Sequence, residues 1–186
     1  MENREIECRF LEIDKEALIK KLLDLGAEDQ GEKLLQEVII YDKDLKWRNE
    51  DKRMRIRNAD GKLTLSYKEH TDHNTVDGTI EIEIGIDNIK QTELLLEKLG
   101  FASFRHQEKK RHTFILDSVT FDIDSWPRIP TYVELEGDSE EALKKAAAAV
   151  GYDWKDVVFE NPRSVIENRY KIPVGKMTWF TFERFE

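Results

Sequence analysis

The sequence of 186 residues contains a single cysteine, Cys8, so no disulfide can form within the chain. A chain that folds without disulfides suits a reducing compartment. The first residues, MENREIECRF, lack the apolar core of a signal peptide, and no apolar run approaches the length of a membrane span. We therefore expect a cytoplasmic protein with no membrane partner.

Two further absences narrow the function. The sequence has no G-x-x-x-x-G-K-[ST] loop, so it would not bind phosphate in the manner of P-loop proteins. The formal net charge is −9, so no uniform basic field attracts a nucleic-acid backbone. We expect no nucleic-acid partner, although a local basic pocket is compatible with this charge.

Charged residues, in contrast, are abundant. Asp, Glu, Lys and Arg make up 37% of the chain, whereas about a quarter is usual. Apolar residues make up 39%, which is enough for the core of one domain of ordinary size. The surplus of ionised side chains must therefore lie on a solvated surface or in a polar interior.

Three segments have the apolar spacing of amphipathic helices. Each follows a capping residue and stops at a glycine: Asp14 to Gly26, Asp87 or Asn88 to Gly100, and Asp138-Ser139 to Gly151. A shorter fourth helix is expected from about Ser164 to Tyr170. The aromatic tail MTWFTFERFE alternates loosely and is expected to add an edge strand or a flap.

Between the helices, side chains alternate with period two, which predicts strands at 4–13, 34–42, 52–58, 62–69, 79–86, 103–116, 119–125 and 131–136. The 103–116 segment is long enough that we expect it to be bent or broken. The order strand, helix and three strands occurs over 4–69 and again over 79–136, with similar text (EIECRFLEID and EIEIGID) before each helix. This repeat indicates a duplicated β-α-β-β-β unit.

Eight strands suffice to close a barrel. We therefore predict an α+β fold: a closed eight-stranded antiparallel β-barrel with its helices packed outside. Residues 1–186 are expected to form a single domain, with the core in residues 3–137 and the C-terminal helices and tail in residues 138–186.

The predicted strands carry charged residues at alternate positions, mostly of one sign per strand. The acidic pairs are Glu5/Glu7, Glu81/Glu83, Asp122/Asp124 and Glu134/Glu136, and the basic sets are Arg53/Arg55/Arg57, Lys62/Lys68 and Lys109/Arg111. One such strand fits a solvated face. The whole set does not, because like charges on neighbouring positions repel each other. The helices also need the apolar strand faces, so we expect the charged faces to point into the barrel.

A barrel interior crowded with ions is costly unless the ions pair or bind a ligand. A polyphosphate with divalent cations is such a ligand. Arg and Lys neutralise phosphate oxygens, and clustered carboxylates hold Mg²⁺ or Mn²⁺. The charge pattern therefore predicts a metal-dependent phosphate site within the barrel.

In this order the motifs resemble the CYTH superfamily, also called triphosphate tunnel metalloenzymes, which includes class IV adenylate cyclases, thiamine triphosphatases and inorganic tripolyphosphatases. Glu5-Ile6-Glu7-Cys8-Arg9 matches the opening E-x-E-x-K motif of the family. The later motifs match at Arg55/Arg57, Lys68, Glu81/Glu83, Lys109/Arg111, Asp124 and Glu134/Glu136. The set covers about residues 3–137 and is specific as an ordered series.

Two departures from the family pattern stand out. Arg9 occupies the position of the opening lysine, so the charge is kept but the point geometry of an ammonium is not. The family usually has Leu-Gly-x-Phe before the last E-x-E, where this chain reads Ile129-Pro130-Thr131-Tyr132. We expect this second segment to shape one mouth of the tunnel.

The resemblance also implies roles for individual residues. The catalytic residues would be Glu5, Glu7, Arg9 and Lys68. The metal, Mg²⁺ or Mn²⁺, would be held by Glu5, Glu7 and Glu136, with Glu134 and Asp124 nearby. The triphosphate would bind to Arg9, Arg55, Arg57, Lys68, Lys109 and Arg111. Glu81 and Glu83 would orient the basic residues or hold a second metal.

The implied function is a metal-dependent enzyme acting on a small-molecule triphosphate, either ATP, tripolyphosphate or thiamine triphosphate. A class IV adenylate cyclase-like reaction, from ATP to cyclic AMP and pyrophosphate, is the leading interpretation, because the length and the C-terminal helices resemble that branch. A tripolyphosphatase or thiamine triphosphatase would use the same residues. A non-catalytic polyphosphate- or nucleotide-binding module is the third alternative. The resemblance also suggests a homodimer.

Overall fold

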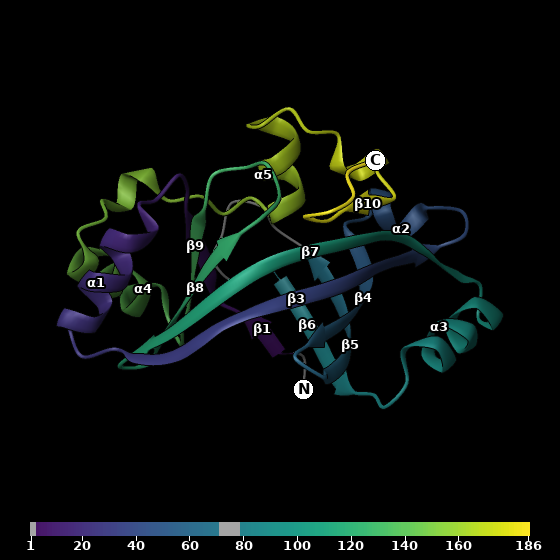
Figure 1. The fold of residues 1–186 in the computed structure, drawn as a ribbon, viewed down its shortest axis with the longest axis horizontal. Coiled ribbons are helices and arrows are strands. Elements are labelled where there is room, and N and C mark those ends of the chain that lie inside the picture. Colours follow the sequence, from purple (N-terminus) through teal and green to yellow (C-terminus); the bar gives the residue numbers. More distant parts are fainter. Residues whose placement is uncertain (1–2, 71–78) are drawn as a thin grey trace.

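The computed structural model describes residues 3–70 and 79–186, with side chains from residue 6 onward. Its main feature is one curled, largely antiparallel sheet (Figure 1). The strands are β1 (Asn3–Glu5), β2 (Glu7–Phe10), β3 (Glu28–Asp42), β4 (Lys52–Ala59), β5 (Lys62–His70), β6 (Thr79–Gly85), β7 (Phe101–Leu116), β8 (Val119–Ser125), β9 (Tyr132–Glu136) and β10 (Trp179–Phe180).

Both edges of the curled sheet are formed by the N-terminal segment. Its strand order is β1-β6-β5-β4-β3-β7-β8-β9-β2, and β10 pairs in parallel with β7 outside this path. The first and last members, β1 and β2, are successive parts of one segment separated at Ile6. When they are counted as one strand, eight strands form the path. The predicted eight-stranded antiparallel architecture is thus confirmed.

The helices are α1 (Lys15–Asp24), α2 (Lys46–Asn49), α3 (Ile89–Lys98), α4 (Glu140–Val150) and α5 (Pro162–Asn168), with short 3₁₀ turns at Trp154–Asp156 and Val174–Lys176. Three predicted N-caps are confirmed, because the side chains of Asp14, Asn88 and Ser139 accept hydrogen bonds from the backbone of the first helical turn. No helix among the described residues is long and apolar enough to cross a membrane.

Several boundaries differ from those expected. The predicted strand 4–13 is divided because β1 pairs with β6 whereas β2 pairs with β9, so the chain changes partners at Ile6. The segment 103–116 is not broken: β7 is continuous from Phe101 to Leu116, and register shifts against β3 absorb its irregularity. The fourth helix begins at Pro162 rather than Ser164, because the Asn161 side chain caps it.

One short helix was missed altogether. The carboxylate of Asp42 accepts hydrogen bonds from the backbone N–H groups of Lys46 and Trp47, at 3.0 and 2.7 Å, and this contact stabilises α2. Four residues are too few to show an apolar period, so the sequence carries no helical signal there.

The largest apolar cluster lies outside the curl rather than within it. Leu22 of α1 and Leu143 of α4 pack with outward-facing side chains of β8 and β9, among them Phe121, Ile123 and Leu135. Figure 1 shows α1 and α4 together at one end of the long strands β3 and β7, with α3 at the other end. Because side chains alternate along a strand, this outer core directs the charged positions inward.

We predict that Phe121→Ala lowers the free energy of unfolding by about 3–5 kcal/mol, because the Phe121 ring is 0% exposed and its removal leaves a cavity. Denaturant titration measures this change, provided that the wild-type and variant proteins unfold with the same dependence of free energy on denaturant concentration. The control Phe182→Ala, at a ring 45% exposed, should lose less than about 1 kcal/mol. Equal losses in the two variants would contradict this assignment of the core.

Candidate active site

A cavity of about 460 Å³ lies inside the curled sheet, and its described lining comes from each of the strands β2 to β9. Its described lining contains eleven Lys or Arg residues and eight Asp or Glu residues, although the whole chain carries a net charge of −9. The cations are Arg9, Arg48, Lys52, Arg53, Arg55, Arg57, Lys68, Arg105, Lys109, Arg111 and Arg163. A basic interior is therefore enclosed in an acidic protein.

Asp124 on β8 anchors two of these cations. Its carboxylate is 0% exposed and accepts from Lys109 Nζ at 2.6 Å and from Arg111 Nε at 2.7 Å. The pairing of β7 with β8 places Arg111 opposite Asp124. Arg111 also contacts Asp122 and Glu134. Burial alone would lower the pKa of Arg111, but these three carboxylates hold it well above its ordinary value.

Arg9 makes contacts that a lysine could not make. Its Nε donates to Glu134 at 2.7 Å, its Nη2 donates to Glu7 at 3.0 Å, and its Nη1 donates to the backbone carbonyl of Glu160 at 3.0 Å. Burial opposes the charge of Arg9, but Glu7 and Glu134 raise its pKa. The planar fork fixes all three partners at once, which an ammonium on a flexible chain does not. Arg9, which replaces the lysine usual in the family, therefore also has a structural role, because it binds the segment before α5.

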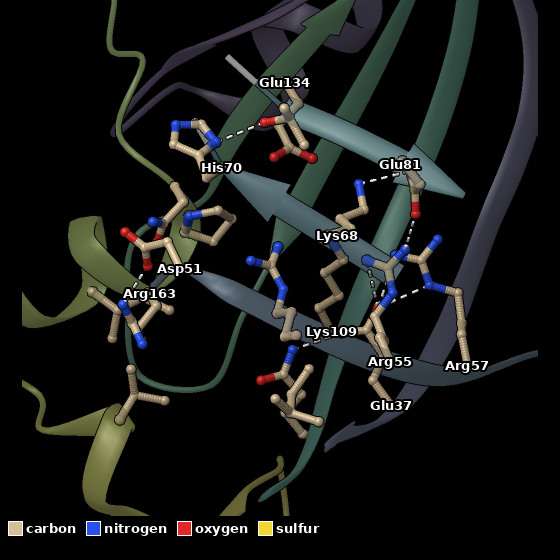
Figure 2. Close-up of a pocket in the computed structure, with 18 of the residues that line it drawn as sticks. Glu37, Asp51, Arg55, Arg57, Lys68, His70, Glu81, Lys109, Glu134 and Arg163 are labelled. Atoms are coloured by element: carbon tan, nitrogen blue, oxygen red, sulfur yellow. Dashed lines mark hydrogen bonds and ion pairs between the residues drawn. The ribbon is translucent and has the colours of Figure 1, made fainter. Parts of the chain in front are cut away.

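Glu37 on β3 is a site residue that the sequence reasoning missed. Its carboxylate is buried and accepts from Arg57 Nε at 2.8 Å and from Gln107 Nε2 at 2.6 Å, with Arg55 Nη1 at 3.6 Å (Figure 2). Burial would raise its pKa, but Arg57 and Arg55 hold the pKa far below its usual range. Glu37 is the one acid in the run LLQEVII of residues 34–40, so no alternating charge marked it.

Glu81 connects the cations of two neighbouring strands. It accepts from Arg55 Nη2 at 3.2 Å and pairs with Lys68 Nζ at 2.8 Å (Figure 2). Glu83 is more exposed and accepts from the hydroxyl of Thr64 at 3.3 Å. The contacts of Glu81 are those expected of a residue that orients basic side chains.

The predicted metal ligands fall into two groups. Glu7 and Glu136 face each other as partners on β2 and β9. Burial and the nearby charge of Glu7 raise the pKa of Glu136, so this pair carries a repulsion that a bound cation would relieve. Asp124 and Glu134, by contrast, already contact Lys109, Arg9 and Arg111.

The backbone of Glu5 lies in β1 opposite Thr79, and its side chain is outside the described part. Among the described side chains, no three of His, Cys, Asp and Glu converge in a metal-binding cluster. Of the described predicted ligands, the adjacent Glu7 and Glu136 are the ones that could hold a divalent cation, and the assignment of Glu5 as a third ligand stays a prediction.

The structure brings the described predicted residues to one cavity. Its lining includes Glu7, Arg9, Arg55, Arg57, Lys68, Glu81, Glu83, Lys109, Arg111, Glu134 and Glu136. Asp124 lies behind this lining and contacts it through Lys109 and Arg111. Their individual roles in binding and catalysis stay predictions.

Several other lining residues were not predicted, and two pairs of them show why. Arg105 and Gln107 continue the alternation of Lys109 and Arg111 along β7, so extending that face would have found them. Arg163 and Asp51 form an ion pair at 2.7 Å although 112 positions separate them. No local pattern in the sequence could have joined that second pair.

Comparison with known proteins agrees with this geometry. Residues 3–155 match the family model described as the CYTH domain. The chain belongs to the CYTH domain family. A Methanocaldococcus jannaschii protein named "putative adenylate cyclase" is 25% identical over 141 residues, which span 76% of this chain and 81% of that protein.

Two solved structures share this CYTH fold. A Vibrio parahaemolyticus protein named "putative adenylate cyclase" superposes with a TM-score of 0.77 at 13% identity, over 90% of this chain and 99% of the other. A Hippeastrum "putative adenylyl cyclase", reported to show a dominant triphosphatase activity, superposes with a TM-score of 0.64 at 16% identity, over 88% and 95% of the two chains. At these identities the likeness concerns the fold.

We predict that Asp124→Asn destabilises the CYTH domain by about 3–5 kcal/mol, because the buried charges of Lys109 and Arg111 lose a shared partner. Thermal and denaturant unfolding measure the loss. The control Asp44→Asn removes a carboxylate whose side chain is 77% exposed and should change stability by less than about 0.5 kcal/mol. A loss below about 1 kcal/mol in Asp124→Asn would show that the network is not a stabilising unit.

Proposed function

We propose that this CYTH protein is a metal-dependent enzyme that processes a triphosphate. The first candidate reaction is the conversion of ATP to cyclic AMP and pyrophosphate. The observation that carries the proposal is the excess of cations over carboxylates in one enclosed cavity of a protein with net charge −9. A polyanion is the ligand that balances such a cavity. The name of the Methanocaldococcus jannaschii relative supports the cyclase reaction.

The triphosphate would bind to Arg55, Arg57, Lys68, Lys109 and Arg111, with Arg9 beside them. The carboxylates that contact these cations hold their side chains in place before a ligand arrives, so binding orders little. Arg55 Nε and Ser66 Oγ support this site, because both atoms are buried without a hydrogen-bond partner among the described residues. The two residues face each other on β4 and β5, so one phosphate oxygen could satisfy both.

Glu7 and Glu136, with Glu5, would hold Mg²⁺ or Mn²⁺. A divalent cation bound there would neutralise phosphate charge and orient or activate the attacking group. Glu134 and Asp124 belong to the proposed metal set only as neighbours, because their oxygens already accept from Arg9, Lys109 and Arg111.

In the cyclase reaction, the ribose 3′-hydroxyl attacks the α-phosphate of ATP and pyrophosphate leaves. The cations of β4, β5 and β7 would hold the β- and γ-phosphates in line and stabilise the departing pyrophosphate. Arg9 and Lys68, the two proposed catalytic cations, both lie near Glu7, and their charges help to keep its pKa low although burial opposes this. Glu7 thus stays an anion able to bind metal.

The second candidate is a phosphohydrolase of tripolyphosphate or thiamine triphosphate. The Hippeastrum protein favours it, because that relative in fold is reported to have a dominant triphosphatase activity. Water would then attack a terminal phosphoryl group held by the same cations. The third candidate is a module that binds polyphosphate or a nucleotide without turnover.

Incubation of the purified protein with Mg²⁺ or Mn²⁺ and ATP, tripolyphosphate or thiamine triphosphate separates the three candidates. We expect cyclic AMP with pyrophosphate from ATP, identified by chromatography and mass spectrometry. Orthophosphate as the product would select the hydrolase. Tight binding of tripolyphosphate with no turnover of any substrate would contradict the enzyme proposal and favour the binding module.

The metal assignment has a test that does not need turnover. We expect Mn²⁺ to raise the Tm of the wild-type protein, and both Glu7→Gln and Glu136→Gln to remove that shift, because each loses a proposed ligand. The control Glu97→Gln, at an exposed position of α3, should keep it. If Glu7→Gln keeps both the Mn²⁺-induced shift and full metal-dependent activity, the metal site is elsewhere.

The pH dependence of the same shift follows from Glu136. Its raised pKa means that the folded protein keeps this carboxyl protonated to a higher pH than the unfolded chain does. Protons and metal compete for the same oxygens, so the Mn²⁺-induced shift should shrink as the pH falls towards the raised pKa of Glu136. A shift that stays constant between about pH 8 and pH 5 would contradict carboxylate ligation.

A further inference from the structure

The cations of the cavity are not all neutralised in the same way. Those of the proposed triphosphate site each contact a carboxylate: Arg55 and Arg57 contact Glu37, Lys109 contacts Asp124, and Arg111 contacts three acids. Arg105 on β7 differs, since no carboxylate of the described chain lies within ion-pair distance of it. Its side chain nevertheless lies at the cavity wall and is only 4% exposed.

Neutral groups hold the Arg105 guanidinium in position. Its Nε donates to Gln107 Oε1 at 2.9 Å, and its Nη1 donates to the backbone carbonyl of Val174 at 2.9 Å. Gln107 in turn donates to Glu37 at 2.6 Å. No acceptor for Arg105 Nη2 is found within the described ranges 3–70 and 79–186. A buried guanidinium without a counter-ion destabilises the folded protein, and a bound anion would offset that unfavourable free energy.

Two more guanidinium groups line the same end of the cavity. Arg53 lies one inward-facing position beyond Arg55 on β4, roughly 7 Å further along that strand. Arg163 of α5 also lines the cavity and is paired with Asp51 (Figure 2). Burial and the charges of Arg163 and Arg53 lower the pKa of Arg105 to about 10, although Tyr41 and Glu167 oppose this shift. Positive charge therefore concentrates here beyond what the local carboxylates balance.

A purely structural role explains these features less well. If Arg105 served only to hold the Val174 carbonyl, a neutral donor would do so without a buried charge. Arg53 has no ion pair or hydrogen bond within the part of the chain that the structure describes, so it holds no element in place. Neither residue falls on a position of the family motifs in this sequence, which begin on these strands at Arg55 and Lys109.

We propose that Arg53, Arg105 and Arg163 form a further anion subsite at the mouth of the cavity beside α5, which binds a phosphoryl group beyond the third. The inference rests on the proposed triphosphate function, since the subsite extends the row of cations that begins at Arg55, Arg57 and Lys109. It deepens that function by naming the substrate class: linear phosphate chains of four or more units bind more tightly than chains of three. Phosphate fits a cluster of guanidinium groups because each group offers a planar pair of donors.

The test is equilibrium binding of linear tripolyphosphate and linear tetraphosphate to the full chain in EDTA, measured by isothermal titration calorimetry. We expect wild-type protein to bind tetraphosphate about tenfold more tightly than tripolyphosphate. In Arg53→Gln the preference should fall to about twofold or less, while the Kd of tripolyphosphate changes by less than about threefold. Arg105→Gln should behave in the same way, and Arg53→Gln decides the matter if the buried Arg105 variant does not fold.

The matched control is Arg169→Gln, which removes an exposed arginine of the same C-terminal segment outside the cavity. It should leave both affinities unchanged. Equal affinities for the two ligands in wild-type protein, or equal weakening of both ligands in Arg53→Gln, would overturn the subsite. ATP binding that exceeds tetraphosphate binding and depends on Arg53 would assign this mouth to a nucleobase and also overturn it.

The outcomes separate this inference from the proposed function. If tripolyphosphate binds but tetraphosphate gains nothing, the subsite fails and the triphosphate site stands. If neither binds, both are wrong.

Discussion

The structure depends on one constraint, which is that ionised side chains enclosed by a curled sheet must be held by opposite charges. Asp124 shows the constraint in its strongest form, since it has no exposed surface and is contacted by Lys109 and Arg111. Glu37 does the same for Arg55 and Arg57. Removing one member of such a pair leaves a buried charge uncompensated. The pairs therefore hold the donors of the cavity wall in place, ready for a ligand.

This polar interior is compatible with a stable fold because the apolar core lies elsewhere. The outward faces of β2, β8 and β9 pack beneath α1 and α4, with Phe10, Phe121 and Leu135 buried between them. The duplicated β-α-β-β-β unit does not repeat this packing equally. In the first half α1 packs against α4, whereas α3 in the second half leaves Leu94, Leu95 and Leu99 exposed. A similar sequence pattern thus leads to different burial because only one half receives a C-terminal helix.

The cavity also has a direction along which its chemistry changes. Two adjacent carboxylates, Glu7 and Glu136, lie where β2 and β9 pair. Cations held by carboxylates follow along β4 and β7. Beside α5, neutral groups hold Arg105, Asp51 pairs with Arg163, and Arg53 has no ion pair or hydrogen bond within the described residues. A linear anion that carries a metal at one end matches such a gradient. The fold alone, which relatives of 13% and 16% identity share, does not distinguish the reactions that could use it.

The sequence by itself determined the strand count, the repeat, three helix caps and the family, because alternation and capping are local properties of the chain. It also identified most charged positions of the cavity, since inward-facing residues recur at every second position. Only the tertiary structure decided that Glu37 belongs to the site, that Asp51 meets Arg163, and that the N-terminal strand divides at Ile6. These features depend on strand register and on contacts between distant segments. A single charged residue in an apolar strand, such as Glu37, has no charged neighbour at alternate positions to reveal it.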